Sequence, residues 1–347
     1  DCSIQRPPLP VLCADSLRRL SQTTANLSGR SPSVTRALSQ RDLPWPGSKH
    51  RSRRHRRIHT GRTKSYSTAG QVAFCSSEVQ MQTLLPIWGL LLVDVGIQLF
   101  GWAAAVVFKT EKFYDLLGSV AYITVATLSF ALNATRSARD CVLYGFAAIW
   151  ALRLGGFLVY RVLMVSGDKR FDKYLDKPAS YLVVWMLQAV WVWVTLLPIM
   201  LVNINGSAGL IWADFVGWPL WGLGFAVEVV ADFQKLFFKQ DPNNKGKFIN
   251  TGLWSISRHP NYAGEITLWW GVWLSTYGAL PVWQFVVGLC SPLLVTLLLT
   301  KVSGIPILEK SADERWGEDP AYQAYKRNTF VLFPHPFRGK YTSVDSQ

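Results

Sequence analysis

Five side chains that can bind ligands or move protons fall within eight consecutive residues between two apolar stretches. They are Arg258, His259, Asn261, Tyr262 and Glu265. Pro260 disfavours helical geometry at the preceding residue and suits the first turn of a helix, so a helix is expected to begin there. The free backbone N–H groups and the dipole at a helix start favour an anionic ligand. This run therefore predicts a ligand site.

A second candidate group, Glu228, Asp232 and Lys235, precedes that run. A spacing of four residues places the two carboxylates on one helix face, with Lys235 about one turn further on. Such carboxylates can receive ribose hydroxyls, or one of them can hold a proton for donation. The alternative is a structural ion pair with Lys235 or a nearby arginine.

Two arginines, Arg153 and Arg161, are eight residues apart and share a face of an apolar stretch. An arginine inside a membrane needs an anion. A bound phosphate would serve, and so would a structural acid such as Asp94 or Glu228.

A further pair, Tyr322 and Tyr325, is followed directly by Lys326. The segment is amphipathic and is expected to lie at the membrane surface. Tyrosines three residues apart could also cover a nucleotide, and both interpretations stay open.

The elements that must position these groups are apolar helices. Half of the residues are hydrophobic, only 17% are charged, and 16 are Trp, which collects where hydrocarbon meets headgroups. Stretches long enough to cross about 30 Å of hydrocarbon recur. They lie near residues 84–108, 115–133, 141–164, 180–202, 212–232, 263–279 and 281–300. The fold class is therefore expected to be all-α, a polytopic membrane bundle of about seven transmembrane helices.

The charges of the connecting loops set the expected orientation. Segments 165–179 and 233–262 and the chain after Lys301 are basic, whereas 203–211 and 278–281 carry no charge. The positive-inside rule then places the C-terminus in the cytoplasm and Met81 on the far side of the membrane. The membrane itself is expected to be that of the endoplasmic reticulum or another internal membrane. Arg136 and Arg139, on a far-side loop, fit this topology poorly.

The first 80 residues are rich in Arg, Ser and Pro and hold +10 of the net charge of +14. They are expected to be disordered, either as an organelle transit peptide or as upstream sequence wrongly joined at Met81. The expected domains are this tail (1–80), a membrane domain (81–335) and a C-terminal tail (336–347). The basic charge thus gives no indication of nucleic-acid binding. His55 and His59 have zinc-finger spacing but lack a paired Cys, so no metal is expected.

The polar runs together resemble DUF1295, a membrane family related to the C-terminal domain of steroid 5-alpha-reductases. The resemblance covers roughly residues 85–335 and is strongest over 225–330. Five stretches carry it, in order: 232–235, 252–271, 303–306, 308–310 and 322–326.

This resemblance implies a helix bundle that binds NADPH from the cytoplasmic side and reduces an activated C=C bond of a lipid-like or steroid-like substrate. An Asn-Tyr-x-Gly-Glu run that lies at the cofactor in steroid 5-alpha-reductases maps onto Asn261, Tyr262 and Glu265. The acidic residue ahead of it maps onto Asp232. The C-terminal Tyr-Lys segment and the Arg-His pair of sterol reductases map onto the following residues: Tyr325, Lys326, Arg258 and His259.

The resulting hypothesis is hydride transfer with catalytic Glu265, Tyr262 and His259. The residues expected to hold the cofactor are Arg153, Arg161, Asp232, Lys235, Arg258, His259, Asn261, Tyr262, Glu265, Tyr322, Tyr325 and Lys326. The Glu and Tyr that contact the substrate ketone in steroid 5-alpha-reductases do not align, and Asp94, Tyr114 and Tyr122 are candidates by location.

Two other functions remain open. Isoprenylcysteine-type methyltransferases use S-adenosylmethionine and share Arg-His-Pro-x-Tyr-x-Gly, but this chain departs from them at Glu265 and at Lys310, where they carry a paired Glu. The other alternative is a non-catalytic lipid-binding membrane protein. In every case the expected partners are the bilayer and a hydrophobic small molecule.

Overall fold

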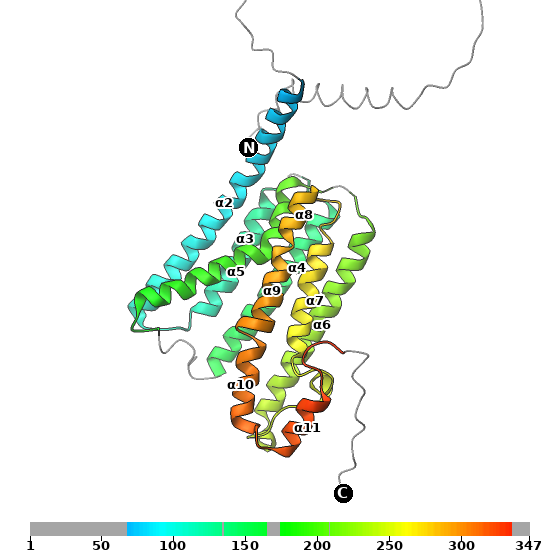
Figure 1. The fold of residues 1–347 in the computed structure, drawn as a ribbon. Helices are drawn as coiled ribbons and strands as arrows, with labels where there is room; N and C mark the ends of the chain where they lie inside the picture. Colours follow the sequence, from blue (N-terminus) through cyan, green and yellow to red (C-terminus); the bar gives the residue numbers. More distant parts are fainter. Residues whose placement is uncertain (1–67, 134, 165–173, 208, 335–347) are drawn as a thin grey trace, which may run out of the picture. The chain divides into compact units, whose positions relative to one another are not determined.

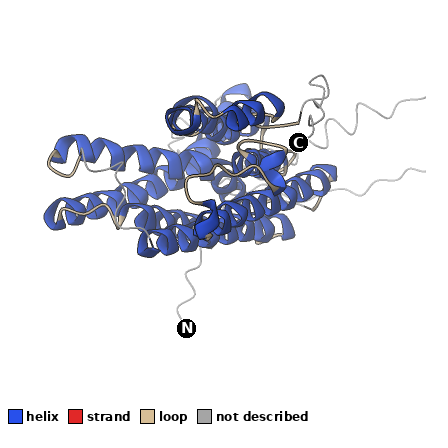
Figure 2. Cartoon of the chain, turned by 90° about the horizontal axis from the view of Figure 1, so that it is seen from below, coloured by secondary structure: helices blue, strands red, loops and turns tan. Residues whose placement is uncertain are grey.

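The computed structural model describes residues 68–133, 135–164, 174–207 and 209–334. Across these ranges the regular structure is helical and no strand forms, which confirms the all-α prediction (Figure 2). Contacts divide the chain into two compact units, Asp1–Met81 and Gln82–Gln347. The helices that carry the polar clusters all belong to the second unit. The predictions for residues 1–67 and 335–347 lie outside the described residues.

Six stretches of the described chain are long and apolar enough to cross a membrane, so the protein is a multi-pass membrane protein. Five lie in α2 (Thr68–Phe108), α3 (Tyr114–Ala131), α4 (Ala138–Met164), α5 (Pro178–Asn205) and α6 (Trp212–Gln240). The sixth is Val282–Trp316, which comprises α8 (Val282–Gly288), α9 (Cys290–Leu297), η3 (Leu298–Val302) and α10 (Ile305–Trp316). With α7 (Pro260–Leu274), these make a bundle of about seven long elements, as predicted (Figure 1).

Two helix boundaries differ from the predictions. The α2 backbone is helical from Thr68, inside the stretch predicted to be disordered, because the basic run ends at Lys64 and only Glu78 is charged over 68–80. Helix α6 continues to Gln240 rather than ending near 232. Its last turns carry lysines that the sequence predicted to lie in a loop, but Phe233 and Phe237 extend the apolar face and stack on each other.

Helices α6 and α7 lie side by side in the closest pairing of the bundle (Figure 1). Glycines line their seam. A Cβ at Gly264 would lie 2.5 Å from the carbonyl oxygen of Gly224, and one at Gly271 would lie 2.6 Å from that of Gly217. The helix backbones can therefore approach closely only because these side chains are absent, and this approach brings the polar faces of α6 and α7 together.

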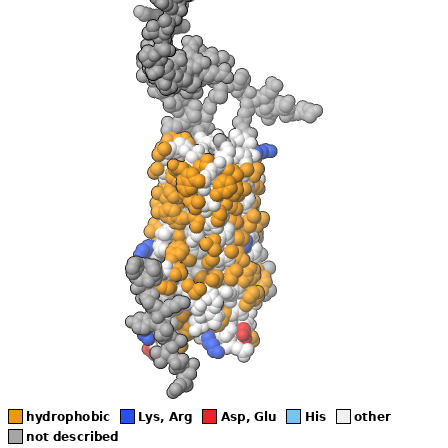
Figure 3. Space-filling model, turned by 90° about the vertical axis from the view of Figure 1, so that its right-hand side faces the viewer, with side chains coloured by type: hydrophobic (Ala, Val, Ile, Leu, Met, Phe, Trp, Pro, Cys, Tyr) orange, Lys and Arg blue, Asp and Glu red, His pale blue; other side chains and the backbone are white. Residues whose placement is uncertain are grey.

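The centre of the bundle is aromatic. Tyr122 of α3 contacts Trp150 of α4 and Trp191 of α5, with ring centroids 5.1 and 5.7 Å apart, and it also contacts Trp269 of α7. The outer surface is largely apolar: Figure 3 shows hydrophobic side chains over most of one face. Such a surface fits a bilayer, in which exposed Leu and Phe cost no hydration free energy.

The C-terminal elements α10 and α11 (Pro320–Asn328) gather at one end of the bundle, near the start of α7 (Figure 1). An isolated bridge joins Ser257, just before α7, to Phe330, just after α11, and the N–H of Arg258 donates to the carbonyl of Phe330 at 2.8 Å. This end of the bundle therefore brings together three segments that are far apart in sequence.

Candidate functional site

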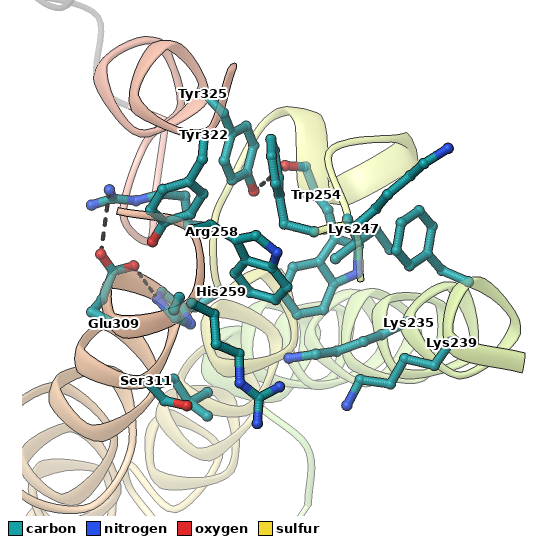
Figure 4. A pocket seen from close by; sticks show the side chains of 17 residues that line it. Lys235, Lys239, Lys247, Trp254, Arg258, His259, Glu309, Ser311, Tyr322 and Tyr325 are labelled. Carbon is teal, nitrogen blue, oxygen red and sulfur yellow. Dashed lines mark hydrogen bonds and ion pairs between the residues drawn. The ribbon is translucent and has the colours of Figure 1, made fainter. Parts of the chain in front are cut away.

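A cavity of about 190 Å³ opens at this end of the bundle (Figure 4). We call it the basic pocket. It lies between the end of α6, the loop before α7, and α10 with α11. Its lining residues are Lys235, Phe238, Lys239, Lys247, Phe248, Ile249, Trp254, Arg258, His259, Leu308, Glu309, Ser311, Ala312, Arg315, Trp316, Tyr322 and Tyr325.

The lining of the basic pocket is strongly cationic and aromatic. Five side chains of the lining are basic, and Glu309 is the one carboxylate in it. The cations are Lys235, Lys239, Lys247, Arg258 and Arg315. Six aromatic rings complete the wall. They belong to Phe238, Phe248, Trp254, Trp316, Tyr322 and Tyr325. The pocket is thus suited to a polyanion that also carries a flat ring.

The loop before α7, residues 252–259, is fixed from both sides. The side chain of Gln234 on α6 accepts from the N–H of Leu253 at 3.0 Å, and Trp254 donates to the carbonyl of Ala231 at 3.0 Å. From α11, the Tyr325 hydroxyl donates to the carbonyl of Trp254 at 2.7 Å. Gly252 takes a positive φ of 60°, a conformation that favours glycine. The loop is thereby held rigidly against the pocket.

His259 ends this loop as predicted, directly before the first residue of α7. Its Nε2 lies 2.8 Å from Glu309, and its ring stacks on that of Tyr262. Glu309 also pairs with Arg258 and Lys326, each at 3.4 Å. Burial lowers the pKa of His259, while the hydrogen bond to Glu309 opposes this shift. The neutral ring that donates to Glu309 has Nδ1 left as an acceptor.

The two C-terminal tyrosines remain protonated over the physiological range. Burial raises the pKa of Tyr322 to about 12, and it also raises that of Tyr325. The Tyr322 hydroxyl donates to Asp313 at 3.1 Å, and Lys326 pairs with the same carboxylate at 2.5 Å. Tyr322 and Tyr325 thus present rings and neutral hydroxyls to the pocket.

A second polar group lies further inside the bundle, on α4, α6 and α7; we call it the carboxylate cluster. Arg153 pairs with Glu228 at 2.5 Å and also with Asp232. Asn261 donates to Asp232 at 3.1 Å, and Glu265 interacts electrostatically with Asp232 and Arg153. The cluster therefore joins the predicted acidic pair of α6 to the polar run of α7.

Arg153 makes the ion pair with acids that the sequence offered as one of its two interpretations. Its guanidinium contacts Glu228 and Asp232, so a phosphate-binding role would share it with these carboxylates. Trp150 donates to the second oxygen of Glu228 at 3.3 Å, which fixes that carboxylate further. Lys235 instead lies over the ring of Trp254, 4.5 Å from its centroid.

The remaining predicted residues divide between the two groups. The basic pocket includes Lys235, Arg258, His259, Tyr322 and Tyr325, whereas the carboxylate cluster includes Arg153, Asp232, Asn261 and Glu265. Tyr262 stacks on His259 between them, and Lys326 supports the pocket through Glu309. The side chain of Arg161 lies outside the described residues.

Several pocket residues were not predicted from the sequence. Lys239 and Lys247 contributed to the prediction only as charges of the basic segment 233–262, and Arg315 only as part of the basic chain after Lys301. Phe248 was not predicted as a site residue, and neither was Trp316. The excess of lysines over 235–247 is a signal that could have indicated an anion site.

The N-terminal candidates take different positions. Tyr122 is buried in the aromatic centre beside Trp150, and Glu265 lies within electrostatic range of it. Asp94 is fully buried and accepts from Gln98 of its own helix at 3.3 Å. Tyr114 donates to the carbonyl of Val184. Tyr122 is thus the candidate with an observed link to the carboxylate cluster.

Comparison with known proteins identifies the family. The family described as "Protein of unknown function (DUF1295)" matches residues 101–329. The chain belongs to DUF1295. The matched region contains both the basic pocket and the carboxylate cluster.

A short part of the chain is also similar to a curated protein, the probable O-methyltransferase ustE of Ustilaginoidea virens. The two are 40% identical over 53 residues, which are 15% of this chain and 18% of that protein. No solved structure matches. The family therefore rests on the DUF1295 match alone.

Proposed function

We propose that this DUF1295 member is a membrane-embedded reductase that uses NADPH to reduce an activated C=C bond of a hydrophobic substrate. The observation that supports this most is the basic pocket, with five basic side chains against one carboxylate and six aromatic rings. NADPH carries a pyrophosphate, a 2′-phosphate and two stackable bases. S-adenosylmethionine carries a positive sulfonium and no phosphate, so this pocket repels it more than it attracts it.

Unpaired buried atoms also fit such a ligand. Twelve buried side-chain atoms of the described chain have no hydrogen-bond partner, and three of them lie within residues 258–261: Nε of Arg258, Nδ1 of His259 and Oδ1 of Asn261. Burying such groups unsatisfied is costly, so their closeness in sequence supports the proposal of a ligand there. Arg258 and the pocket lysines would pair the phosphates, and Asn261 and Asp232 would hold ribose or the nicotinamide amide.

NADPH, when bound, supplies the hydride; the protein must provide position and a proton. The carboxylate cluster is suited to the proton because Glu228, Asp232 and Glu265 share the single guanidinium of Arg153. Three charged carboxylates around one cation in a low-dielectric interior are strongly disfavoured, so the cluster retains a proton that it can donate. We assign Glu265 as the donor; Tyr262 lies on the same helix, three residues before it, and stacks on His259, which lines the pocket.

A ligand comparison tests the cofactor. Purified protein in detergent is heated with NADPH or with S-adenosylmethionine, each at about 100 times the dissociation constant typical of such sites. At that concentration, a ligand of the folded protein raises its free energy of unfolding by about 2.7 kcal/mol. We expect NADPH to raise the Tm and S-adenosylmethionine to leave it unchanged. Absence of NADPH stabilisation and of any quenching of NADPH fluorescence would refute the proposal.

Glu265→Gln tests the proton donor separately. The amide keeps the size of the side chain, so we expect NADPH binding to persist while NADPH oxidation with an enone lipid falls by roughly 10²- to 10⁴-fold. Equal oxidation rates for the variant and the wild type would remove Glu265 from this role.

The second candidate function is methyl transfer from S-adenosylmethionine, which the similarity to a probable O-methyltransferase favours. It makes the opposite prediction in the heating experiment: S-adenosylmethionine stabilises the protein and NADPH does not. A non-catalytic lipid-binding role predicts that neither does.

A further inference from the structure

The geometry points to Lys247 and Arg315 as the residues that recognise the adenosine 2′-phosphate and so select NADPH over NADH. This inference rests on the proposed function. It concerns the outer part of the basic pocket, where two separate segments, one at residues 246–248 and one at residues 315–316, are held together.

The orientation of the cofactor follows from the two polar groups. A hydrophobic acceptor reaches the protein from the bilayer, so hydride transfer must take place toward the interior of the bundle. The carboxylate cluster lies there, and Asp232 and Lys235 of α6 connect it to the basic pocket. The nicotinamide therefore belongs at the cluster end. The adenosine belongs at the opposite, outer end of the pocket.

Aromatic rings at the outer end can hold the adenine. Phe248 contacts three of them, with centroids 5.2 Å from Tyr322, 5.4 Å from Tyr325 and 6.1 Å from Trp316. The indole N–H of Trp316 donates to the carbonyl of Gly246 at 2.6 Å. This bond ties α10 to the loop after α6 and fixes the rings in place. An adenine ring can stack on such rings whatever phosphates the nucleotide carries.

Two cations flank this aromatic wall. Lys247 precedes Phe248 and Arg315 precedes Trp316 in sequence, and both cations line the pocket. Other cations of the pocket are engaged: Arg258 pairs with Glu309, and Lys235 lies over Trp254. In the part of the chain that the structure describes, Lys247 and Arg315 have no carboxylate partner. They are therefore available for a dianion.

A 2′-phosphate matches this pair in charge, and the bond between Trp316 and Gly246 keeps the two segments that carry them side by side. The two side chains are exposed, so they can meet a phosphate that keeps part of its hydration. Arg315 can bind two phosphate oxygens at once, and Lys247 can supply the second positive charge. NADH has a hydroxyl at this position and would gain nothing from either cation.

The experiment measures the dissociation constants of NADPH and NADH for the full chain in detergent, by NADPH or NADH fluorescence. In the double variant K247A/R315A, we expect NADPH to bind roughly 10- to 100-fold more weakly, whereas NADH binding changes by less than about threefold. The matched control is Lys310→Ala, whose exposed side chain lies near Glu314 and does not line the pocket. The control should keep the preference for NADPH.

A second probe separates this inference from the proposed function. Adenosine 2′,5′-diphosphate carries the 2′-phosphate without nicotinamide, and it should protect the wild type against heating but not the double variant. An unchanged ratio of NADPH to NADH affinity in K247A/R315A overturns the assignment of these residues while NADPH use stands. Failure of the wild type to bind either dinucleotide overturns the proposed function and this inference together.

Discussion

Arg153 shows how one side chain can hold two helices together inside the membrane. It comes from α4, and its guanidinium meets Glu228 and Asp232 one turn apart on α6. Removing one partner of a buried ion pair leaves the other charge uncompensated, which is much worse than removing all partners. The effect of a substitution here therefore depends on which charges remain.

Arg153→Met should lower the free energy of unfolding by about 3–5 kcal/mol, because Glu228 and Asp232 stay buried without a cation. The triple variant R153M/E228Q/D232N, which removes the charges on both sides, should recover most of that loss. Denaturant unfolding in mixed micelles measures both. Equal stability of the single and triple variants would mean that the three groups do not interact as a network.

His259 gives the protein a predictable response to acid. Burial keeps its pKa below the usual value of 6.5, so the unfolded chain takes up a proton at higher pH than the folded chain does. The stability contributed by the neutral ring is complete above pH 6.5 and is lost as the pH falls through 6.5 toward the folded-state pKa. His259→Gln can still donate to Glu309 but cannot titrate.

Between pH 7.5 and 5.5, the Tm of the wild type should therefore fall further than that of His259→Gln. Heating both proteins across this range in one detergent is the measurement. A Tm decrease in the variant as large as that of the wild type would show that other groups control the acid response.

At the scale of elements, the seam between α6 and α7 determines whether the site assembles. Gly264→Ala places a Cβ 2.5 Å from the carbonyl oxygen of Gly224 and 2.6 Å from the backbone nitrogen of Glu228. Backbone atoms cannot move aside cheaply, so the helices must separate, at a cost of about 1–3 kcal/mol. We also expect weaker NADPH binding, because Asp232 and Asn261 come from the two helices that separate.

Gly222→Ala on α6 is the matched control, since no atom lies within 4 Å of the added methyl group. It should be neutral or should stabilise by about 0.5–1 kcal/mol through helix propensity. Thermal unfolding of both variants separates a steric effect at the seam from a general effect of replacing glycine. Equal Tm values for the two variants would contradict the steric explanation.

The elements also show what a sequence can predict in a membrane protein. Apolar runs located the helices, because spanning a bilayer requires length and hydrophobicity, and both are local properties. The start of α7 followed from Pro260. The end of α6 was wrong because lysines at its last turns can extend from a helix as readily as from a loop. The partners of His259 and Phe248 come from α10 and α11, and local patterns do not reveal such contacts.

At the scale of the whole molecule, the predicted orientation in the membrane rests on the charges at the two ends of the bundle. Arg139 fits that orientation poorly. The structure explains this residue: Arg139 is buried and paired with Asp214, with two contacts of 2.7 Å. Of the two arginines, Arg136 is the exposed one. The predicted topology stays a prediction, which an accessibility measurement can test.

This topology predicts opposite accessibility for two introduced cysteines in a cysteine-free background. Asn243→Cys lies in the basic loop after α6, and Gly209→Cys lies in the uncharged loop before α6, where an added side chain has open space. In sealed vesicles with the cytoplasmic face outward, a membrane-impermeant maleimide should label the first and spare the second until detergent is added. The basic pocket lies at the same end as Asn243, so the same result places it where cytosolic NADPH can enter. Labelling of Gly209→Cys alone would show that the bundle has the opposite orientation. The basic pocket would then face away from cytosolic NADPH.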